Sequence, residues 1–383
     1  MEDLLGFASF GKRKRSSASR KQHTKAAKIE YVPEPIEVLC GKSMPCLSHD
    51  TLGTVLDSTA AEPPALLLLE LAEALKSLLS AKQNLHDKRL SPAEYRVARA
   101  LANPWESLGK WKFVNRSAMK MAELDARLNL TREFIADGHL SFVDLCGAPG
   151  GFSEYLAFRA NYREVRGHGI SLRVPGMSHL NWQLPPAVQD VVSVLYGADG
   201  TGDLYKQENI EHFVHSVLET HSSGVNLVVA DGGFQDARNH ENQEQVMHRL
   251  VLCEVLVMCR VLRSGGHFVC KTFELSSTFS LGLLWVLHHL FDELMIVKPV
   301  TSRPASSERY VVGRGWRLFQ PHQVISHFSA LHAAFDSSPP GAVVKSAELT
   351  KARAFLNFVQ RSGIVYEGRA SLARFLISLV RVV

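Results

Sequence analysis

From Leu140 onward, short apolar runs alternate with longer stretches of helical periodicity, and this alternation constrains the fold of the 383-residue chain more than any other feature. Near-continuous apolar runs indicate strands that are buried on both faces, as in a parallel sheet covered by helices on either side. The predicted strands are Ser141–Leu145, Glu164–Ile170, Val191–Tyr196, Asn226–Ala230, His267–Lys271, Leu294–Lys298 and Arg309–Gly313. The pattern therefore predicts an α/β fold.

Composition and periodicity divide the chain into four regions. Residues 1–28 are basic and Ser-rich without an apolar period, which is typical of a disordered tail. Residues 29–139 begin irregularly and become helical, residues 140–320 hold the predicted sheet, and residues 321–383 are helical again. Helices are expected in Pro63–Ala81, after a capping box formed by Ser91 and Glu94, over Arg116–Asn129, and near His322–Phe335, Ser346–Ser362 and Ala370–Val380.

The net charge of +5 is concentrated near the N-terminus. Residues 11–28 carry a charge of +8 and no acid, which leaves residues 29–383 with a net charge of −1. Affinity for a polyanion must then come from a local patch of basic residues in the body of the protein, together with the basic tail of residues 11–28. The run Lys12–Arg15 predicts import into the nucleus, with an RNA-binding arm or a solubilising tail as the alternatives.

The cysteines and the apolar segments exclude several classes of protein. The six cysteines form no Cys-x-x-Cys pair and no histidine cluster has ligand spacing, so we expect no metal site. The Leu-rich segment Pro63–Ala81 is interrupted by Glu70, Glu73 and Lys76, which predicts an amphipathic helix rather than a membrane span. The N-terminus lacks the apolar core of a signal peptide, and we expect no membrane association.

A glycine-rich turn, Gly147-Ala148-Pro149-Gly150-Gly151, follows the first predicted strand directly. Glycines let the backbone approach a ligand closely, and the N–H groups of a following helix attract a carboxylate or a hydroxyl. In an open parallel sheet such ligands bind beyond the carboxyl ends of the strands. The run lacks the dinucleotide fingerprint and the P-loop lysine, which leaves a different ligand, or a tight turn with no ligand, as the alternatives.

Residues 143–152 resemble motif I of the ribose 2′-O-methyltransferases related to the bacterial heat-shock rRNA enzyme. The resemblance implies a Rossmann-like methyltransferase fold, with a mostly parallel seven-stranded sheet, an antiparallel last strand and helical N- and C-terminal additions. It also implies that the chain binds S-adenosylmethionine and the product S-adenosylhomocysteine, without a metal. The residues implied to bind the cofactor are Asn115, Gly147, Ala148, Pro149, Gly150, Gly151, Phe152, Ser171, Leu172, Asp203 and Asp231.

Four charged residues match the chemistry that ribose methylation requires. The hydroxyl must be deprotonated or nearly so, and a lysine accepts its proton only if the pKa of the lysine is lowered. Asp231 and Lys271 end predicted strands, and Lys120 lies on the helix before the first strand. Glu308 precedes the last strand, and if that strand is antiparallel, Glu308 lies on the same edge of the sheet. Taken one at a time, such residues are more often solvated charges.

Taken together, the four residues resemble the Lys-Asp-Lys-Glu tetrad of the same family in their order and in their flanking sequences. The resemblance implies that all four are catalytic. Lys271 would deprotonate or polarise the 2′-hydroxyl, and Lys120 would be a second cation at that centre. Asp231 and Glu308 would orient the two lysines.

Three segments outside motif I resemble the cap-specific mRNA ribose 2′-O-methyltransferases. They are residues 103–106, 115–122 and 302–310, and the resemblance extends over about residues 95–320. It implies methyl transfer to the first transcribed nucleotide of capped mRNA, from cap 0 to cap 1, in the nucleus. It also implies that Arg303, Ser307 and Arg309 face RNA and that Arg99 helps form a cap pocket. The alternative is a structural role, in which these residues cap the last predicted strand and the helix of the lead-in.

Two other functions stay open. The first is a 2′-O-methyltransferase for another RNA or cap position, such as rRNA, snRNA or cap 2. The second, of another class, is a non-catalytic RNA-binding subunit of a capping complex, which predicts a broken tetrad, whereas all four residues are present here. The expected partners are capped RNA and the capping or transcription machinery.

Overall fold

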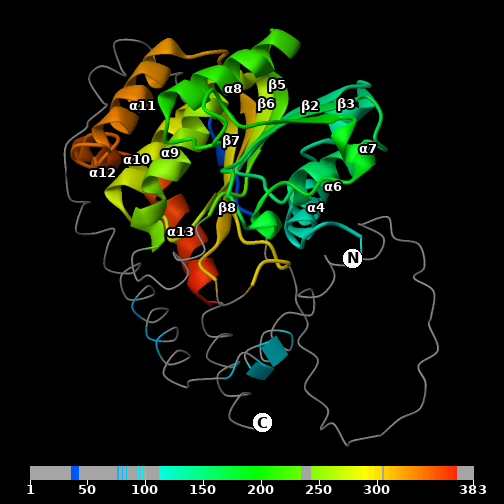
Figure 1. Ribbon diagram of the computed structural model, residues 1–383. Coiled ribbons are helices and arrows are strands. Elements are labelled where there is room, and N and C mark those ends of the chain that lie inside the picture. Colours follow the sequence, from blue (N-terminus) through cyan, green and yellow to red (C-terminus); the bar gives the residue numbers. More distant parts are fainter. Residues whose placement is uncertain are drawn as a thin grey trace, which may run out of the picture.

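The computed structural model describes residues 36–42, 112–233, 243–303 and 306–368, together with isolated positions between 76 and 100 (Figure 1). The predicted capping box is present, because the Ser91 backbone N–H donates to Glu94 Oε2 at 2.8 Å and the Glu94 N–H donates to Ser91 Oγ at 3.3 Å. The predicted helix Ala370–Val380 and most of Pro63–Ala81 lie outside the described residues. Within the described part of the chain, no helix is both long and apolar enough to cross a membrane.

The sheet contains eight strands in the order β1-β7-β8-β6-β5-β2-β3-β4. The bounds are β1 Leu39–Cys40, β2 Leu140–Leu145, β3 Val165–Ile170, β4 Val192–Leu195, β5 Val225–Ala230, β6 Leu262–Thr272, β7 Phe291–Val297 and β8 Arg309–Trp316. The five strands β2, β3, β4, β5 and β6 run parallel to one another. β8 lies between β6 and β7 and is antiparallel to both. The seven predicted strands and the antiparallel last strand are confirmed.

The prediction differs from the structure at several places; among them, β7 starts three residues before the predicted Leu294 and β8 ends three residues after the predicted Gly313. The strand β1, two residues long and antiparallel to β7, was missed because so short a segment has no periodicity to detect. β6 starts five residues before the predicted His267, since Ser264-Gly265-Gly266 breaks the apolar pattern while the backbone pairing continues past a bulge. The predicted helix Ser346–Ser362 is divided at Ala352 into α12 (Ser346–Lys351) and α13 (Arg353–Gly368).

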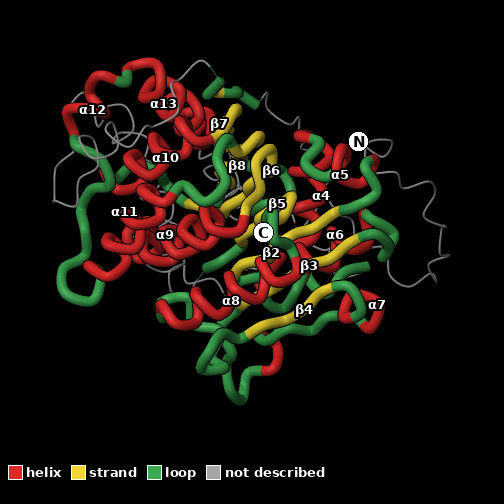
Figure 2. The backbone as a smooth tube through the Cα atoms, turned by 90° about the horizontal axis from the view of Figure 1, so that it is seen from above, coloured by secondary structure: helices red, strands yellow, loops and turns green. Residues whose placement is uncertain are grey.

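Helices cover both faces of the sheet, as the view from above shows (Figure 2). The larger core packs on α8 (Gln207–Thr220), α9 (Gln243–Val261), α10 (Thr278–Leu290) and α11 (His322–Ala334). The second core, on the other face, packs on α4 (Ser117–Leu128), α5 (Arg132–Ala136), α6 (Gly151–Arg159) and α7 (Pro186–Gln189). β5 shows why its sequence is apolar on both faces from Leu227 onward: Val228 and Ala230 enter the first core, whereas Leu227 and Val229 enter the second.

Hydrogen bonds fix α4, which carries Lys120, to the sheet. The Glu123 carboxylate accepts from the backbone N–H groups of Val300 and Thr301, both at 2.9 Å, and from Thr301 Oγ1 at 2.8 Å. At the end of the helix, the Arg314 guanidinium of β8 donates to the Leu128 carbonyl at 2.8 Å. The position of Lys120 is therefore determined by contacts far from it in the sequence.

Replacing Glu123 by Ala should destabilise the protein by about 2–3 kcal/mol, because two buried backbone N–H groups lose a charged acceptor. Chemical denaturation measures this loss. Glu348→Ala is the matched control, since Glu348 pairs at 2.8 Å with a Lys351 side chain that is 71% exposed, and it should cost less than about 0.5 kcal/mol. Equal losses in the two variants would contradict the anchoring role of Glu123.

Candidate active site

The carboxyl ends of β2, β5 and β6 and the amino end of β8 meet at one edge of the sheet. Ala230 pairs with both Leu145 and Cys270, and Lys271 pairs with Tyr310 at the start of the antiparallel β8. Asp231, Lys271 and Glu308 therefore come together although they follow or precede different strands. Lys120 reaches the same place from α4.

The structure brings the four residues of the predicted tetrad into direct contact. Lys120 Nζ lies 3.1 Å from Glu308 Oε1 and 3.4 Å from both carboxylate oxygens of Asp231. Lys271 Nζ donates to the backbone carbonyl of Asp231 at 2.7 Å and lies 3.3 Å from Asp231 Oδ1. The four side chains are only 10–16% exposed, so solvent screens their charges weakly.

Tyr310 also belongs to this cluster, and the sequence analysis missed it. Its hydroxyl donates to Asp231 Oδ1 at 2.6 Å and accepts from Lys120 Nζ at 3.0 Å. The period of two along a strand places Tyr310 on the same face as Glu308, and this signal could have found it. Lys298 and Ser302 were missed as well: Lys298 Nζ donates to the Glu308 carbonyl at 2.6 Å, and Ser302 Oγ donates to Glu308 Oε1 at 3.0 Å.

The charges in the cluster stabilise one another. Burial by itself lowers the pKa of Lys271, but the nearby carboxylates of Asp231, Glu308 and Glu254 outweigh burial and raise it. Burial likewise favours protonated Glu308, but Lys120, Lys271 and Lys298 outweigh it and hold the pKa of Glu308 well below its ordinary value. The lowered lysine pKa that a base requires is thus absent from the free site, and Lys271 is an ammonium ion at neutral pH.

The glycine-rich turn joins β2 to α6. Gly150 has φ of +114°, which disfavours any other residue, and a side-chain carbon there would collide with Leu184. A side-chain carbon at Gly147 would collide with Asp144, and one at Gly151 with Asn115 and Ser117. Packing within the protein therefore already requires these glycines, which the sequence analysis attributed to the close approach of a ligand.

Asp144, on β2, holds the glycine-rich turn in place by hydrogen bonds to the first turn of α6. Its Oδ2 accepts from the Ser153 N–H at 3.1 Å and from Ser153 Oγ at 2.6 Å, and burial raises the pKa of this carboxyl to about 7. The Phe152 side chain is buried beside Tyr310, with ring centroids 6.2 Å apart, so only its backbone remains available to a ligand. The N-cap residue of α6 is Gly150, which has no side chain, so Asp144 supplies the acceptor in the first turn of this helix.

The loops after β3 and β4 lie beside this turn. A side-chain carbon on Gly202 would collide with the Ser171 carbonyl, so the two loops are in direct contact. Ser171 is buried, Leu172 is exposed, and the half-buried Asp203 accepts from the Tyr205 N–H through Oδ1 at 2.9 Å. Most of the residues predicted to bind a cofactor therefore lie on one continuous rim, formed by the loops after β2, β3 and β4, whereas Asn115 precedes α4 and Asp231 follows β5.

Two of the residues predicted to face RNA lie inside the protein. Ser307 is 0% exposed and Arg309 is 2% exposed, because the antiparallel β8 begins between two strands of the sheet. The prediction that these two side chains face RNA requires them to be exposed, whereas the structure buries both. Arg303 is half-buried near the tetrad, and Arg99 lies outside the described residues.

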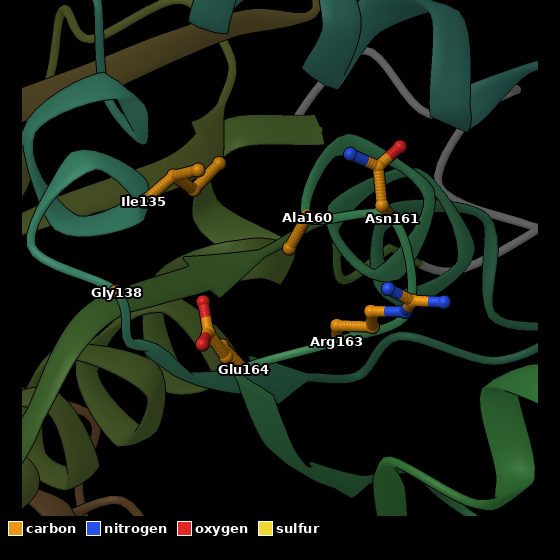
Figure 3. A pocket seen from close by; sticks show the side chains of 6 residues that line it. All are labelled: Ile135, Gly138, Ala160, Asn161, Arg163 and Glu164. Carbon is orange, nitrogen blue, oxygen red and sulfur yellow. The ribbon is translucent and has the colours of Figure 1, made fainter.

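A surface cavity of about 430 Å³ lies at the opposite end of the sheet (Figure 3). The turns before β2 and β3 form it. It is lined by Ile135, Gly138, Ala160, Asn161, Arg163 and Glu164. Because the tetrad and the glycine-rich turn lie at the carboxyl ends of the strands, this cavity is not part of their site.

A seven-stranded core with an antiparallel strand next to the edge, a glycine-rich turn after its first strand and charged residues at the strand ends define a Rossmann-like methyltransferase. The model of the FtsJ-like methyltransferase family matches residues 113–316, which is more than half of the chain. The chain belongs to the FtsJ-like methyltransferase family.

Curated relatives carry more specific names. The chain is 39% identical over 262 residues to the mouse (Mus musculus) "Cap-specific mRNA (nucleoside-2'-O-)-methyltransferase 1" and 38% identical to the human (Homo sapiens) protein of that name. It is 36% identical to an "Inactive cap-specific mRNA (nucleoside-2'-O-)-methyltransferase 1B" of Caenorhabditis briggsae. Each match covers 64% of this chain but only 31% of the relative, so the chain spans less than a third of their length.

Replacing Glu308 by Gln should lower stability by roughly 3 kcal/mol near pH 7, because Lys120 loses a buried partner. The pKa of Glu308 is lowered on folding, so its carboxylate stabilises the protein above the unfolded pKa of about 4.5, and this contribution is lost as the pH falls. Denaturation between pH 3 and pH 7 should show the two proteins converging in acid. A gap that is constant with pH would contradict the ionised pairing.

Proposed function

We propose that this chain transfers a methyl group from S-adenosylmethionine to the ribose 2′-hydroxyl of the first transcribed nucleotide of capped mRNA, converting cap 0 to cap 1. The observation that carries the proposal is the mutual contact of Lys120, Asp231, Lys271 and Glu308. The names of the relatives support the cap as the substrate, and membership of the methyltransferase family supports the reaction.

The residues at the rim fit S-adenosylmethionine. The backbone N–H groups of Gly151 and Phe152 at the start of α6 suit its carboxylate, and the half-buried carboxylate of Asp203 suits the amino group of adenine. Ser171 provides a hydroxyl and a carbonyl, rather than an acid, on the side where the ribose would lie. When bound, this cofactor supplies an electrophilic methyl group on a sulfonium ion.

Lys271 and Lys120 act on the acceptor oxygen. Two ammonium groups near a ribose hydroxyl stabilise the oxyanion that it becomes and so lower its pKa. Asp231 orients both amines, and Glu308 with Tyr310 orients Lys120. Lys271 can take the hydroxyl proton once it has released its own, and the free-amine fraction of Lys271 then limits the rate.

We place the RNA on the side of Arg303, which is half-buried at the tetrad, and the cap toward the segment that includes Arg99. The basic segment of residues 11–28 would direct the protein to the nucleus, where capping and transcription proteins are the proposed partners. An rRNA or another cap position remains the alternative substrate. No metal enters the proposal, since phosphate and hydroxyl groups can be held by the cations already named.

The proposed cofactor contact at Asp203 is directly testable. Replacing Asp203 by Ala should weaken the binding of S-adenosylhomocysteine about tenfold, the value of one hydrogen bond to a charged acceptor. Calorimetric titration measures this affinity. Glu208→Ala, on an exposed acid five residues away, is the control and should bind normally. Unchanged affinity in a folded Asp203 variant would remove that residue from the cofactor site.

Lys271→Arg should abolish methyl transfer while leaving the binding of S-adenosylhomocysteine and capped RNA nearly intact. Arginine keeps the cation but stays protonated, so the accessible base is lost. Single-turnover transfer of tritiated methyl groups to a short capped RNA, with all components saturating, measures the rate. Nuclease mapping of the label then identifies the methylated nucleotide.

Four outcomes of this experiment decide between the alternatives. Transfer to uncapped RNA at an equal rate would favour an rRNA or snRNA enzyme, and label on the second nucleotide would favour cap 2 formation. A near-normal rate for Lys271→Arg would mean that a cation suffices. No transfer by the natural sequence, with normal binding of capped RNA, would favour the non-catalytic subunit; one relative of the chain is named inactive.

A further inference from the structure

A second buried acid lies directly behind the tetrad, on the other face of the sheet. Glu254 is in the middle of α9, is 0% exposed, and belongs neither to the glycine-rich turn nor to the tetrad. Ala230 and Cys270 at the active edge belong to the core on the α9 side, whereas Tyr310 belongs to the core on the α4 side. Glu254 therefore approaches the active edge from the face opposite to Lys120.

The Glu254 carboxyl contacts the three segments that carry the site. The Cys270 thiol, one residue before Lys271, donates to Glu254 Oε2 at 3.4 Å. A side-chain carbon on Gly232, one residue after Asp231, would collide with Glu254 Oε1 and would lie 3.1 Å from Cys146 Cβ. One buried carboxyl thus packs against the Asp231 turn and the strand of Lys271, and it interacts with the Cys146 thiol just before the glycine-rich turn.

The charge of Glu254 and the charge of Lys271 are linked. Burial raises the pKa of Glu254 to about 8, while the Cys270 thiol and the Lys271 ammonium oppose this rise. Glu254 is also one of the three acids that raise the pKa of Lys271. Among the described residues, Oε1 accepts no geometrically well-formed hydrogen bond, so the ionised form depends mainly on the thiols of Cys270 and Cys146 and on the charge of Lys271.

We propose that Glu254 is a positioning residue for methyl transfer, which acts through Lys271 by determining how readily this lysine releases its ammonium proton. The proposal rests on the proposed function, in which Lys271 takes the hydroxyl proton. When Glu254 is neutral, only the carboxylates of Asp231 and Glu308 raise the pKa of Lys271. In its ionised form, after losing a proton to solvent, it adds a third negative charge and retains the proton on Lys271.

Other titratable groups also surround Glu254. They are Asp144 and Cys146 on or after β2, Tyr205 before α8, Asp231 after β5, Cys253 on α9, and Cys270 with Lys271 on β6. Burial raises the pKa of the three thiols and of Tyr205, so these groups stay neutral between pH 7 and 9.5. Asp144 titrates at about pH 7, but it is present in every protein compared below.

The test is Glu254→Gln, which keeps the size of the side chain and removes its ionisation. Trace acetylation with acetic anhydride, read by mass spectrometry across pH 7–9.5, reports the free-amine fraction of Lys271 without any need for activity. Above pH 8 the variant should show at least roughly threefold more reactive Lys271 relative to the natural sequence, the effect of a half-unit shift in pKa. Reactivity that follows the same curve in both proteins would overturn the proposal.

Single-turnover methyl transfer to capped RNA over the same pH range is the second readout. The ratio of the variant rate to the natural rate should rise about threefold between pH 7 and 9.5, because only the natural protein forms the carboxylate at position 254. A merely structural role would lower the rate by the same factor at every pH. A ratio that does not change with pH would overturn the proposal even if the labelling curves differ.

Glu211→Gln is the matched control, since Glu211 makes an ion pair at 2.5 Å with Arg260 at the end of α9, which leads into the amino end of β6, whereas Lys271 lies near the carboxyl end of β6. It should leave both curves unchanged, and a similar change in this variant would overturn the proposal. If the labelling curves differ but neither protein methylates capped RNA, the proposed function fails while the control of Lys271 by Glu254 is retained. If both proteins methylate capped RNA but the labelling curves coincide, the proposed function is retained and the control of Lys271 by Glu254 fails.

Discussion

The carboxylate of Asp231 is the acceptor on which the rest of the site depends. Three donors from three elements converge on it: the Tyr310 hydroxyl at 2.6 Å, Lys271 Nζ at 3.3 Å and Lys120 Nζ at 3.4 Å. Lys271 reaches it because β6 pairs in parallel with β5, Tyr310 reaches it because β8 is antiparallel to β6, and Lys120 reaches it because Glu123 docks α4. A buried carboxylate without these donors would be costly, so the topology and the charge pairing require each other.

Much of this arrangement could be predicted from the sequence, because the end of a buried strand is recognised locally, where an apolar run stops at a polar residue. Apolar runs located the strands, and Asp231 and Lys271 follow from where those runs end. The antiparallel last strand, which came from a resemblance, was needed to bring Glu308 to the same edge. The hydrogen bonds of Tyr310 could not be predicted, because they depend on the register between Lys271 and Tyr310, which no local pattern encodes.

Burial and packing account for what the sequence could not predict. Ser307 and Arg309 have the polarity of surface residues, yet β8 begins inside the sheet and encloses them. Glycines at 147, 150 and 151 suggested a ligand, but Asp144, Leu184 and Asn115 already leave no space for a side chain. Glu254 lies in a helix with no motif around it, and only the fold places it against Gly232. Each of these features arises from contacts distant in the sequence.

The charge balance of the cluster limits how a hydroxyl can be activated there. A neutral hydroxyl that gains a methyl group must lose its proton, so a proton acceptor has to exist near the oxygen. Glu308 is a poor acceptor, because three lysines hold its pKa well below the ordinary value. Lysine 271 is a strong acceptor only after it has lost its own proton, which the surrounding carboxylates oppose. Exclusion of water by bound substrates would strengthen the desolvation that already favours the neutral amine, and so would shift Lys271 toward the form that the reaction needs.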